Sequence, residues 1–417
     1  MAAAGAPAPA ATFQHQAPMS RKTSILGADL LQAYKDILHF WQEHSIDHQQ
    51  GGFYGELDPR GQPVPGAEKG LVLNARILWT FASAYNFLKD PAYLQSARRA
   101  YDYLWQHFWD REHGGLYWSA DARGQMKNGR KQIYGQGFAI YGLAEYYRAS
   151  GDPESLQRAI QLFELIEKHS FDATHGGYLE ARDRDWQPLA DLRLSAKDAN
   201  EPKSMNTHLH IIEPYTNLYR VWPDARLAQQ IEGLLRVFID HITDPQSGHF
   251  HLFFDHDWSV RSSMVSYGHD IEGAWLLNEA AEILGKPDLI GQVKNLSLRL
   301  AQATLNEALA PDGSLYYEKE LSSNHLETDR HWWVQAEAMV GFTDAWQKSG
   351  DPRYLQQAEV LWDYIREKLI DTRGGEWFLR IGPDGKPVLS DPKAGFWKCP
   401  YHNTRALMEM YQRLNKA

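Results

Sequence analysis

The stretch Gly114-Gly115-Leu116-Tyr117 decides the fold, because similar stretches recur along the whole chain. Each has a glycine followed by an aromatic-rich segment suited to a short strand: Gly51-Gly52-Phe53-Tyr54, Gly114-Gly115-Leu116-Tyr117, Gly176-Gly177-Tyr178, Gly248-His249-Phe250, Gly313-Ser314-Leu315-Tyr316 and Gly374-Gly375-Glu376-Trp377. Their first glycines are 63, 62, 72, 65 and 61 residues apart. A period of this kind indicates a repeat architecture of six units.

A second marker has the same period. Prolines suited to the first turn of a helix occur between the glycine stretches, at Pro91, Pro153, Pro223, Pro287 and Pro352. Their spacings are 62, 70, 64 and 65 residues. Two independent markers with one period make a chance pattern a poor explanation.

Each period holds two helical stretches. After Pro91, apolar residues step by three or four, which is typical of a helix with one buried face: Leu94, Ala97, Tyr101, Leu104 and Phe108. Residues 138–147 and 273–284 are apolar or small almost all round, so those helices are covered on every side. Without polar capping repeats at either end, six such units predict an all-α (α/α)6 barrel with short Gly-aromatic β-hairpin loops at one rim.

The domain boundaries follow from composition. Residues 1–27, rich in Ala and Pro at their start, are interpreted as a disordered tail, because the first 18 lack the basic and apolar regions of a signal peptide. No composition shift divides residues 28–417, which we interpret as a single catalytic barrel domain. No run of about 18 apolar residues occurs, so no membrane span is expected. We expect a cytoplasmic protein that is a monomer or a weak homodimer.

Charge and cysteine content exclude several functions. The chain has 43 Lys and Arg against 53 Asp and Glu, a net charge of -10, so a nucleic-acid partner is not expected. Cys399 is the sole cysteine, which rules out an intramolecular disulfide and a Cys-rich metal site. The sequence also lacks the motifs GxGxxG, GxxxxGK[ST], HExxH and GxSxG. It therefore gives no support for a nucleotide-binding loop, a zinc metalloprotease or the nucleophile elbow of an α/β-hydrolase.

The starts of the inner helices are the expected site. All six should begin at one rim of the barrel, and they carry an unusual share of ionisable and aromatic residues: Leu73-Asn74-Ala75-Arg76, Ile133-Tyr134-Gly135-Gln136, Asn206-Thr207-His208-Leu209-His210, Gly268-His269-Asp270-Ile271-Glu272, His331-Trp332-Trp333-Val334-Gln335-Ala336-Glu337 and Trp397-Lys398-Cys399-Pro400-Tyr401-His402. Packing alone does not explain this concentration of polar groups on apolar helices.

Histidines are the first candidates for chemistry. Asn206 and His210 share a helical face, so His210 is expected to face the cavity, whereas His208 is interpreted as a hydrogen-bonded core residue. Glu272 lies three residues after His269, so we expect its carboxylate to hold the second nitrogen of that imidazole. His402 follows a proline suited to a helix start and completes the set.

Other candidates are an arginine, several tryptophans and a long loop. A buried Arg76 needs either a cavity or a carboxylate partner. Trp333 and Glu337 share a helical face, so the Trp333 ring could stack on a sugar while the Glu337 carboxylate binds its hydroxyl groups. Trp332 precedes Trp333 and points in another direction, so we expect it to belong to the core. Trp275 and Trp397 are equally consistent with a sugar platform and with packing. Residues 177–205 form the longest loop, either a lid or a solvated loop.

At these segments the sequence resembles the N-acylglucosamine 2-epimerase superfamily, and most closely its cellobiose 2-epimerase group. The resemblance covers nearly the whole chain from about residue 28. It implies an (α/α)6 barrel and cofactor-free epimerisation at C2 of the reducing-end glucose of β-1,4-linked disaccharides. It also implies acid/base roles for His269 and His402, a third histidine at His210 and an enediolate-binding Arg76. Sugar contacts are implied at Tyr134, Asp198, Asn206, Glu272, Trp333, Glu337 and Trp397.

This chemistry suits the residues, because inversion at C2 needs two bases on opposite faces of a planar enediolate and a cation for its oxyanion. Five alternatives stay open, one of which is a pure sugar-binding protein, although binding alone needs no matched histidines. A mannose-type aldose–ketose isomerase and an N-acylglucosamine 2-epimerase use the same kind of site. A glycoside hydrolase could draw its two carboxylates from Glu272, Glu337, Asp198 and Asp270. A metalloenzyme could use His210, His269 and His402 as ligands, although no metal or cofactor is expected.

Overall fold

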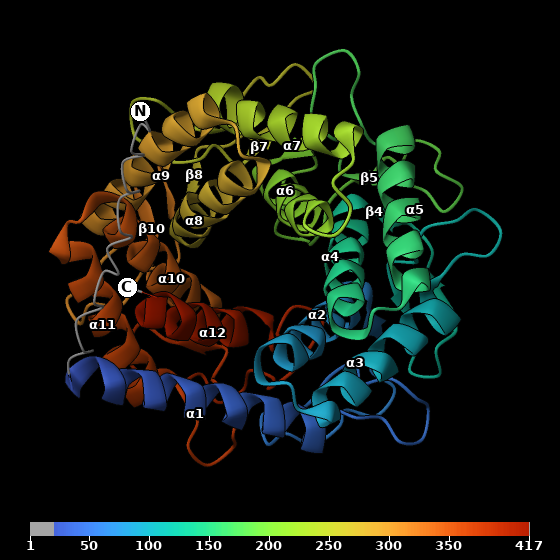
Figure 1. Ribbon diagram of the computed structural model, residues 1–417, viewed down its shortest axis with the longest axis horizontal. Helices are drawn as coiled ribbons and strands as arrows, with labels where there is room; N and C mark the ends of the chain where they lie inside the picture. Colours follow the sequence, from blue (N-terminus) through green and yellow to red (C-terminus); the bar gives the residue numbers. More distant parts are fainter. Residues whose placement is uncertain (1–20, 417) are drawn as a thin grey trace, which may run out of the picture.

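Two concentric rings of helices make up the computed structural model, which describes residues 21–416 (Figure 1). The outer ring contains α1 (Arg21–His44), α3 (Pro91–Tyr103), α5 (Pro153–His169), α7 (Ala225–Val237), α9 (Pro287–Glu307) and α11 (Pro352–Tyr364). The inner ring contains α2 (Leu71–Leu88), α4 (Ile133–Ser150), α6 (Met205–Tyr219), α8 (Tyr267–Leu284), α10 (Trp332–Ser349) and α12 (Tyr401–Lys416). Each inner helix packs against the next, and α12 packs against α2, so the predicted (α/α)6 barrel is confirmed.

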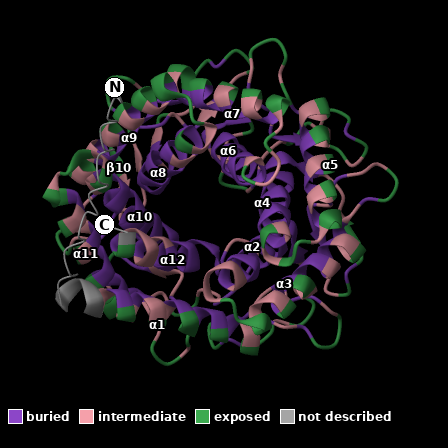
Figure 2. Cartoon of the chain, viewed as in Figure 1, coloured by how far each residue is buried: buried purple, intermediate pink, exposed green. Residues whose placement is uncertain are grey.

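Burial separates the two rings, as the hydrophobic patterns predict. Inner helices such as α4 are buried over nearly their whole length, whereas α5 and the other outer helices leave one face exposed (Figure 2). Three outer helices end in a π-helical turn: η1 (Leu104–Phe108), η2 (Phe238–Ile242) and η3 (Ile365–Leu369). The hydrophobic core therefore lies between the rings and leaves the barrel axis to polar side chains.

Prolines begin four of the outer helices. At α3, α5 and α11 an aspartate precedes the proline and caps the helix; the Asp90 carboxylate, for example, accepts a hydrogen bond from the amide of Ala92. Pro223 differs from the prediction, because it lies before the cap of α7 rather than in its first turn. There Asp224 is the capping residue and Ala225 begins the helix.

The Gly-aromatic stretches are turns that join the rings. Each pairs back onto the end of its outer helix through one antiparallel bridge, as between Leu116 and Trp109, so they are shorter than the predicted hairpins. Gly115 has φ 72°, and a Cβ there would lie 2.6 Å from the Trp186 ring, which explains the glycine. Short strands follow: β1 (Lys69–Gly70), β2 (Ser119–Ala120), β3 (Met126–Asn128), β4 (Lys131–Gln132), β5 (Ala181–Arg182), β6 (Lys203–Ser204), β7 (Phe253–Phe254), β8 (Met264–Ser266), β9 (Glu318–Glu320), β10 (His325–Glu327), β11 (Arg330–His331) and β12 (Arg380–Ile381).

Buried ion pairs fix the turns to the inner helices. An aspartate at each of four turns binds a lysine further along the chain: Asp47–Lys69 at 2.8 Å, Asp110–Lys131 at 3.0 Å, Asp172–Lys203 at 2.9 Å and Asp371–Lys393 at 2.6 Å. The first three lysines lie in the strands that lead directly into α2, α4 and α6. These pairs hold the starts of those inner helices at one rim.

The N-terminal boundary differs from the prediction. Residues 1–20 of the expected tail lie outside the described residues, but residues 21–27 already belong to α1. Apolar residues further along that helix, among them Leu30 and Tyr34, are buried, so the helix is part of the barrel wall. Within residues 21–416, no helix combines the length and apolar character that crossing a membrane requires.

Candidate active site

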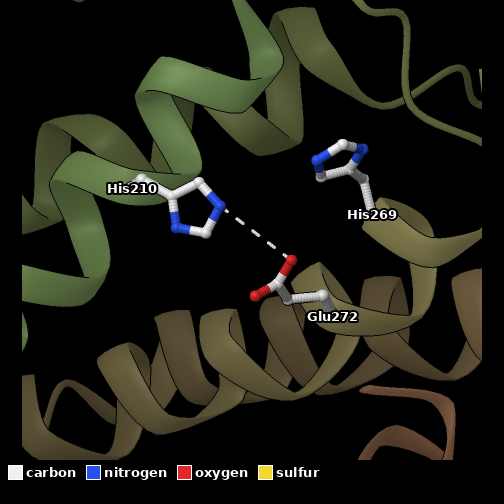
Figure 3. Close-up of side chains that lie close together, drawn as sticks. All are labelled: His210, His269 and Glu272. Carbon is white, nitrogen blue, oxygen red and sulfur yellow. Dashed lines mark ion pairs between the residues drawn. The ribbon is translucent and has the colours of Figure 1, made fainter. Parts of the chain in front are cut away.

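His210, His269, His402 and Arg76 come together at the rim where the inner helices begin. They belong to four different helices, α6, α8, α12 and α2. His210 and His269 each have a ring nitrogen within 4.8 Å of a Glu272 oxygen and of one another (Figure 3). The four residues that the sequence singles out for catalysis therefore form one cluster.

A kink in α6 sets the position of His210. Pro214 has no amide hydrogen to bond the carbonyl of residue 210, and His210 accordingly leaves helical geometry, with φ -92° and ψ 16°. The freed carbonyl packs against α4, where a Cβ on Gly137 would lie 2.5 Å from it. The imidazole is buried beside the rings of Tyr134 and Phe138, with centroids 5.0 Å away in both cases.

His210 is held by one carboxylate and faces a second. Its Nδ1 lies 3.0 Å from Oε2 of Glu213, one turn further along α6. Its Nε2 lies 3.9 Å from Oε2 of Glu272, the contact drawn in Figure 3. Glu213 therefore orients the ring, and Nε2 points to the centre of the cluster.

His269 corrects one expectation. Its Nδ1 lies 2.7 Å from the hydroxyl of Ser266 at the end of β8, and Glu272 makes no hydrogen bond to it. The ring packs 4.7 Å from that of Trp333 and is partly exposed. The expected His269–Glu272 pair does not form, because the imidazole turns toward the residue before the helix instead of along it.

His402 is held from a neighbouring inner helix. Its Nδ1 lies 2.7 Å from Oε1 of Glu337 on α10, and 3.9 Å from Oε1 of Glu272. The ring is 5.6 Å from that of Trp333, which therefore lies against both His269 and His402. A carboxylate that accepts Nδ1–H leaves Nε2 with its lone pair, the form that can take a proton.

Glu337 and Trp275 do not fit the predicted sugar contacts. Glu337 is fully buried, and its oxygens accept hydrogen bonds from Trp275 Nε1 at 3.1 Å and from Arg405 Nη2 at 2.6 Å in addition to facing His402. Trp275 is buried behind it. Both residues therefore support the His402 imidazole, and neither offers a free face or oxygen to a sugar.

Glu272 lies between all three histidines. It is fully buried; Oε1 accepts a hydrogen bond from Arg405 at 2.7 Å, whereas Oε2 has no hydrogen-bond partner. Burial and the neighbouring Glu337 raise the pKa of Glu272 well above its usual value. Oε2 is thus free to interact with a ligand or to carry a proton.

Burial favours the neutral form of all three histidines. Burial lowers the pKa of His269 to about 3, and the positive charge of Arg76 acts in the same direction. Burial also lowers the pKa of His210 and, most strongly, of His402. All three imidazoles are therefore available as bases.

Arg76 has no carboxylate partner among the ion pairs of residues 21–416. Its Nη2 donates a hydrogen bond to the Tyr134 hydroxyl at 2.8 Å, and Nη1 lies 3.8 Å from Cys399 Sγ. The guanidinium packs over the rings of Phe138 and Tyr401, and its Nε has no partner. A buried cation with unused hydrogen-bond capacity is suited to an anionic ligand.

Two of the remaining predicted contacts border this cluster, and the third lies on a loop. Trp397, partly exposed, lies 5.9 Å from the Tyr134 ring, and Asn206 at the start of α6 has a buried side-chain oxygen without a partner. Asp198 lies on the long loop before α6, where Ser195 binds its carboxylate at 2.8 Å through the backbone amide. Asp198 is therefore part of the loop's own structure.

His208 lies away from the cluster, in agreement with its interpretation as a core residue. Its Nε2 accepts a hydrogen bond from the amide of Tyr178 at 2.9 Å, and its Nδ1 donates to the Ser204 carbonyl at 2.7 Å.

Sequence reasoning missed Glu213, Arg405 and Ser266. Glu213 has the same three-residue spacing from His210 that Glu272 has from His269, and Arg405 has it from His402. That spacing was the available signal for the first two residues.

Two groups of side chains have the composition of a metal site. His210, His269 and Glu272 form one, and Glu272, Glu337 and His402 form the other. In the second group Glu272 and Glu337 already bind Arg405, and a metal ion would have to compete with that guanidinium. The three histidines do not form a site by themselves within the described part of the chain.

The fold is a closed helical barrel with three histidines and an arginine clustered at one rim, an arrangement suited to carbohydrate chemistry. The sequence profile of N-acylglucosamine 2-epimerase (GlcNAc 2-epimerase) matches residues 51–406, and the chain belongs to this family.

Three relatives illustrate the similarity. Cellobiose 2-epimerase of Bacteroides fragilis is 50% identical over 90% of this chain and 95% of its own. Cellobiose 2-epimerase of Ruminococcus albus is 39% identical over 90% of this chain and 96% of its own. The solved structure of cellobiose 2-epimerase from Bacillus thermoamylovorans has a TM-score of 0.90 at 38% identity and covers 94% of this chain and 100% of that one.

Proposed function

We propose that this chain is a cofactor-free epimerase that inverts C2 of the reducing-end glucose of β-1,4-linked disaccharides, with cellobiose and lactose as substrates. The observation that carries the proposal is the pair His269 and His402. They are imidazoles from different helices, each bound at Nδ1 by a neighbouring side chain, and both lie against Trp333. The names of the close relatives support the same reaction.

The proposed mechanism uses the two imidazoles in turn. Once the pyranose ring is open, one imidazole removes the proton from C2 and an enediolate forms. The other imidazole enters this step protonated and returns its proton to C2 from the opposite face, so the two histidines exchange protonation states in each turnover. Arg76, whose guanidinium has no carboxylate partner among the described residues, stabilises the negative oxygen. His210 opens the ring or moves the proton between O1 and O2. In this arrangement Nε2 of His210 and the carboxylate of Glu272 face O1 and O2 of the substrate.

The sugar contacts are part of the proposal. Trp333 and Trp397 provide ring faces, and Tyr134, Asn206, Glu272 and Asp198 provide polar groups around the cluster. We further propose that the barrel, from α1 onward, acts as one catalytic domain in a cytoplasmic protein that is a monomer or a weak homodimer. Its lone buried cysteine is consistent with a reducing compartment.

A glycoside hydrolase has less support. Glu272 and Glu337 bind Arg405, and Asp270 binds His249 at 2.7 Å and the Phe250 amide at 2.8 Å. Glu272 keeps one unpartnered oxygen but is buried, and of the four candidate carboxylates only Asp198 lies in a partly exposed position, so no two of them are both exposed to flank a glycosidic bond.

The test is incubation with cellobiose in deuterated water. The expected product is glucosyl-mannose with deuterium at C2, identified by NMR and mass spectrometry. A substrate panel that also contains mannose and N-acetylmannosamine distinguishes this epimerase from the alternative activities. Ketose as the sole product would indicate an isomerase, activity confined to N-acetylmannosamine an N-acylglucosamine epimerase, and free glucose from cellobiose a hydrolase.

A further inference from the structure

Arg405 occupies the centre of the polar network behind the histidines. It lies on α12, three residues after His402, and is buried. Its Nη1 binds Glu213, and its Nη2 binds Glu272 at 2.7 Å and Glu337 at 2.6 Å. The guanidinium is packed between the rings of Trp275 and Tyr401, 4.7 and 4.3 Å from their centroids. One guanidinium thus binds three carboxylates, which come from the inner helices α6, α8 and α10.

Two of those carboxylates hold histidines. Glu213 lies 3.0 Å from Nδ1 of His210, and Glu337 lies 2.7 Å from Nδ1 of His402. Arg405 contacts Oε1 of both, so the same cation stands behind both imidazoles. His269, bound to the Ser266 hydroxyl, is outside this arrangement.

The charge of Arg405 decides what these carboxyl groups can do. Burial alone raises the pKa of a carboxylic acid, and three such groups close together would hold protons. Burial opposes ionisation of Glu213 as well, yet the charges of Arg405 and His210 and the Tyr401 hydroxyl lower its pKa to about 2. Burial raises the pKa of Glu337 although the charge of Arg405 lowers it, so for this residue the acceptor role rests on its 2.6 Å contact with Nη2 of Arg405. An ionised carboxylate can only accept a hydrogen bond, whereas a protonated one can donate one.

The direction of that hydrogen bond determines the tautomer of the imidazole. If the carboxylate accepts, Nδ1 carries the proton and Nε2 has a lone pair for the substrate. If the carboxyl group donates, Nδ1 becomes the acceptor, Nε2 carries the proton, and the neutral ring cannot act as a base at that position.

We propose that Arg405 is a positioning residue that keeps Glu213 and Glu337 as acceptors and thereby holds both His210 and His402 in the Nδ1–H tautomer. Its benefit for turnover rests on the proposed epimerase function, but the tautomers themselves do not. The positive charge is the essential property. A lysine at this position retains the effect in part, and a neutral side chain of similar length loses it.

The experiment combines kinetics with histidine NMR. Protein with ¹⁵N-labelled imidazoles is prepared as wild type, Arg405→Lys and Arg405→Gln, with His210→Asn and His402→Asn to assign the signals. Arg413→Gln is the matched control, since Arg413 lies on the same helix and binds Asp344 at 2.8 Å and Glu409 at 3.1 Å but none of the three carboxylates. Circular dichroism and thermal melting establish that each variant is folded.

We expect Nδ1–H signals for His210 and His402 in the wild type, in Arg405→Lys and in Arg413→Gln, and Nε2–H signals in Arg405→Gln. With cellobiose, kcat should fall about 100-fold in Arg405→Gln, less in Arg405→Lys, and by under threefold in Arg413→Gln. An Nε2–H tautomer of either histidine in the wild type would overturn the proposal even if Arg405→Gln failed to fold, as would unchanged tautomers in a folded Arg405→Gln. Absence of turnover on every sugar would count against the proposed function alone.

Discussion

Nδ1 of His402 and Oε1 of Glu337 lie 2.7 Å apart, although the two residues come from different inner helices and are 65 positions apart in the chain. The position of the imidazole thus depends on how α10 and α12 pack. The same carboxylate would be free to bind a sugar only if this contact broke.

Replacement of Glu337 by Gln tests this relationship. The amide has one oxygen, for which Arg405, His402 and Trp275 would compete, and its nitrogen can donate to Nδ1. We expect kcat on cellobiose to fall 10- to 100-fold with little change in KM, because the residue acts through His402. Glu279→Gln is the control, since Glu279 lies toward the far end of α8 and binds Arg220. A rise in KM at constant kcat would instead indicate a direct sugar contact.

Separate loss of each proposed base should leave a distinctive pattern of deuterium exchange. His269→Asn and His402→Asn should both abolish net epimerisation, since each direction uses one imidazole as base and the other as acid. One variant should still exchange the C2 proton of the glucose form with solvent, and the other only that of the mannose form. Mass spectrometry after incubation of each epimer in deuterated water assigns the roles. Substantial epimerisation by either variant would falsify the two-base scheme.

His208 gives a prediction about stability. Burial lowers its pKa to about 4, below the unfolded value of about 6.5, so the unfolded chain binds the proton first as the pH falls. Stability from this residue is complete above pH 6.5 and is lost between pH 6.5 and 4, by about 3 kcal/mol.

His208→Gln should therefore be less stable at pH 7 yet lose less stability on acidification. Melting temperatures from pH 7 to pH 4 measure the difference in slope. His48→Gln, which changes an exposed histidine, should retain the wild-type slope. Parallel curves for the wild type and His208→Gln would contradict the assignment of a neutral buried imidazole.

Removal of metals is expected to leave epimerisation unchanged. The carboxylates of the Glu272, Glu337 and His402 group are bound to Arg405, and His210 is held by Glu213, so the network is balanced by a guanidinium. The measurement is kcat on cellobiose after exhaustive dialysis against a chelator. A loss of activity that is restored by adding one divalent metal would favour the metalloenzyme alternative.

The repeat made the architecture predictable, but local contacts were harder to infer. A regular spacing of glycines and prolines fixes the number of units and the rim at which the inner helices begin, so the clustering of His210, His269, His402 and Arg76 follows. The partner of each imidazole does not, because His210–Glu213 and His269–Glu272 have identical spacing and only the first pair forms. The choice depends on side-chain rotamers and, for His210, on the kink before Pro214.

Composition misplaced the start of the barrel for a related reason. Residues 21–27 follow the Ala- and Pro-rich segment without a clear boundary in the sequence, yet they extend a helix whose later turns bury Leu30 and Tyr34. The buried face of α1 is provided by contacts with α12, which lies at the other end of the chain. The sequence around residues 21–27 alone does not reveal a contact with a helix at the other end of the chain.

The closure of the ring between α12 and α2 also governs when the protein becomes active during its synthesis. The α12 helix carries His402 and Arg405 and follows the other inner helices in the chain, whereas α2, with Arg76, emerges from the ribosome hundreds of residues earlier. A nascent chain with five finished hairpins therefore lacks both a base and the cation behind it. Until α12 docks, the face of α2 that it covers stays exposed and the site stays incomplete.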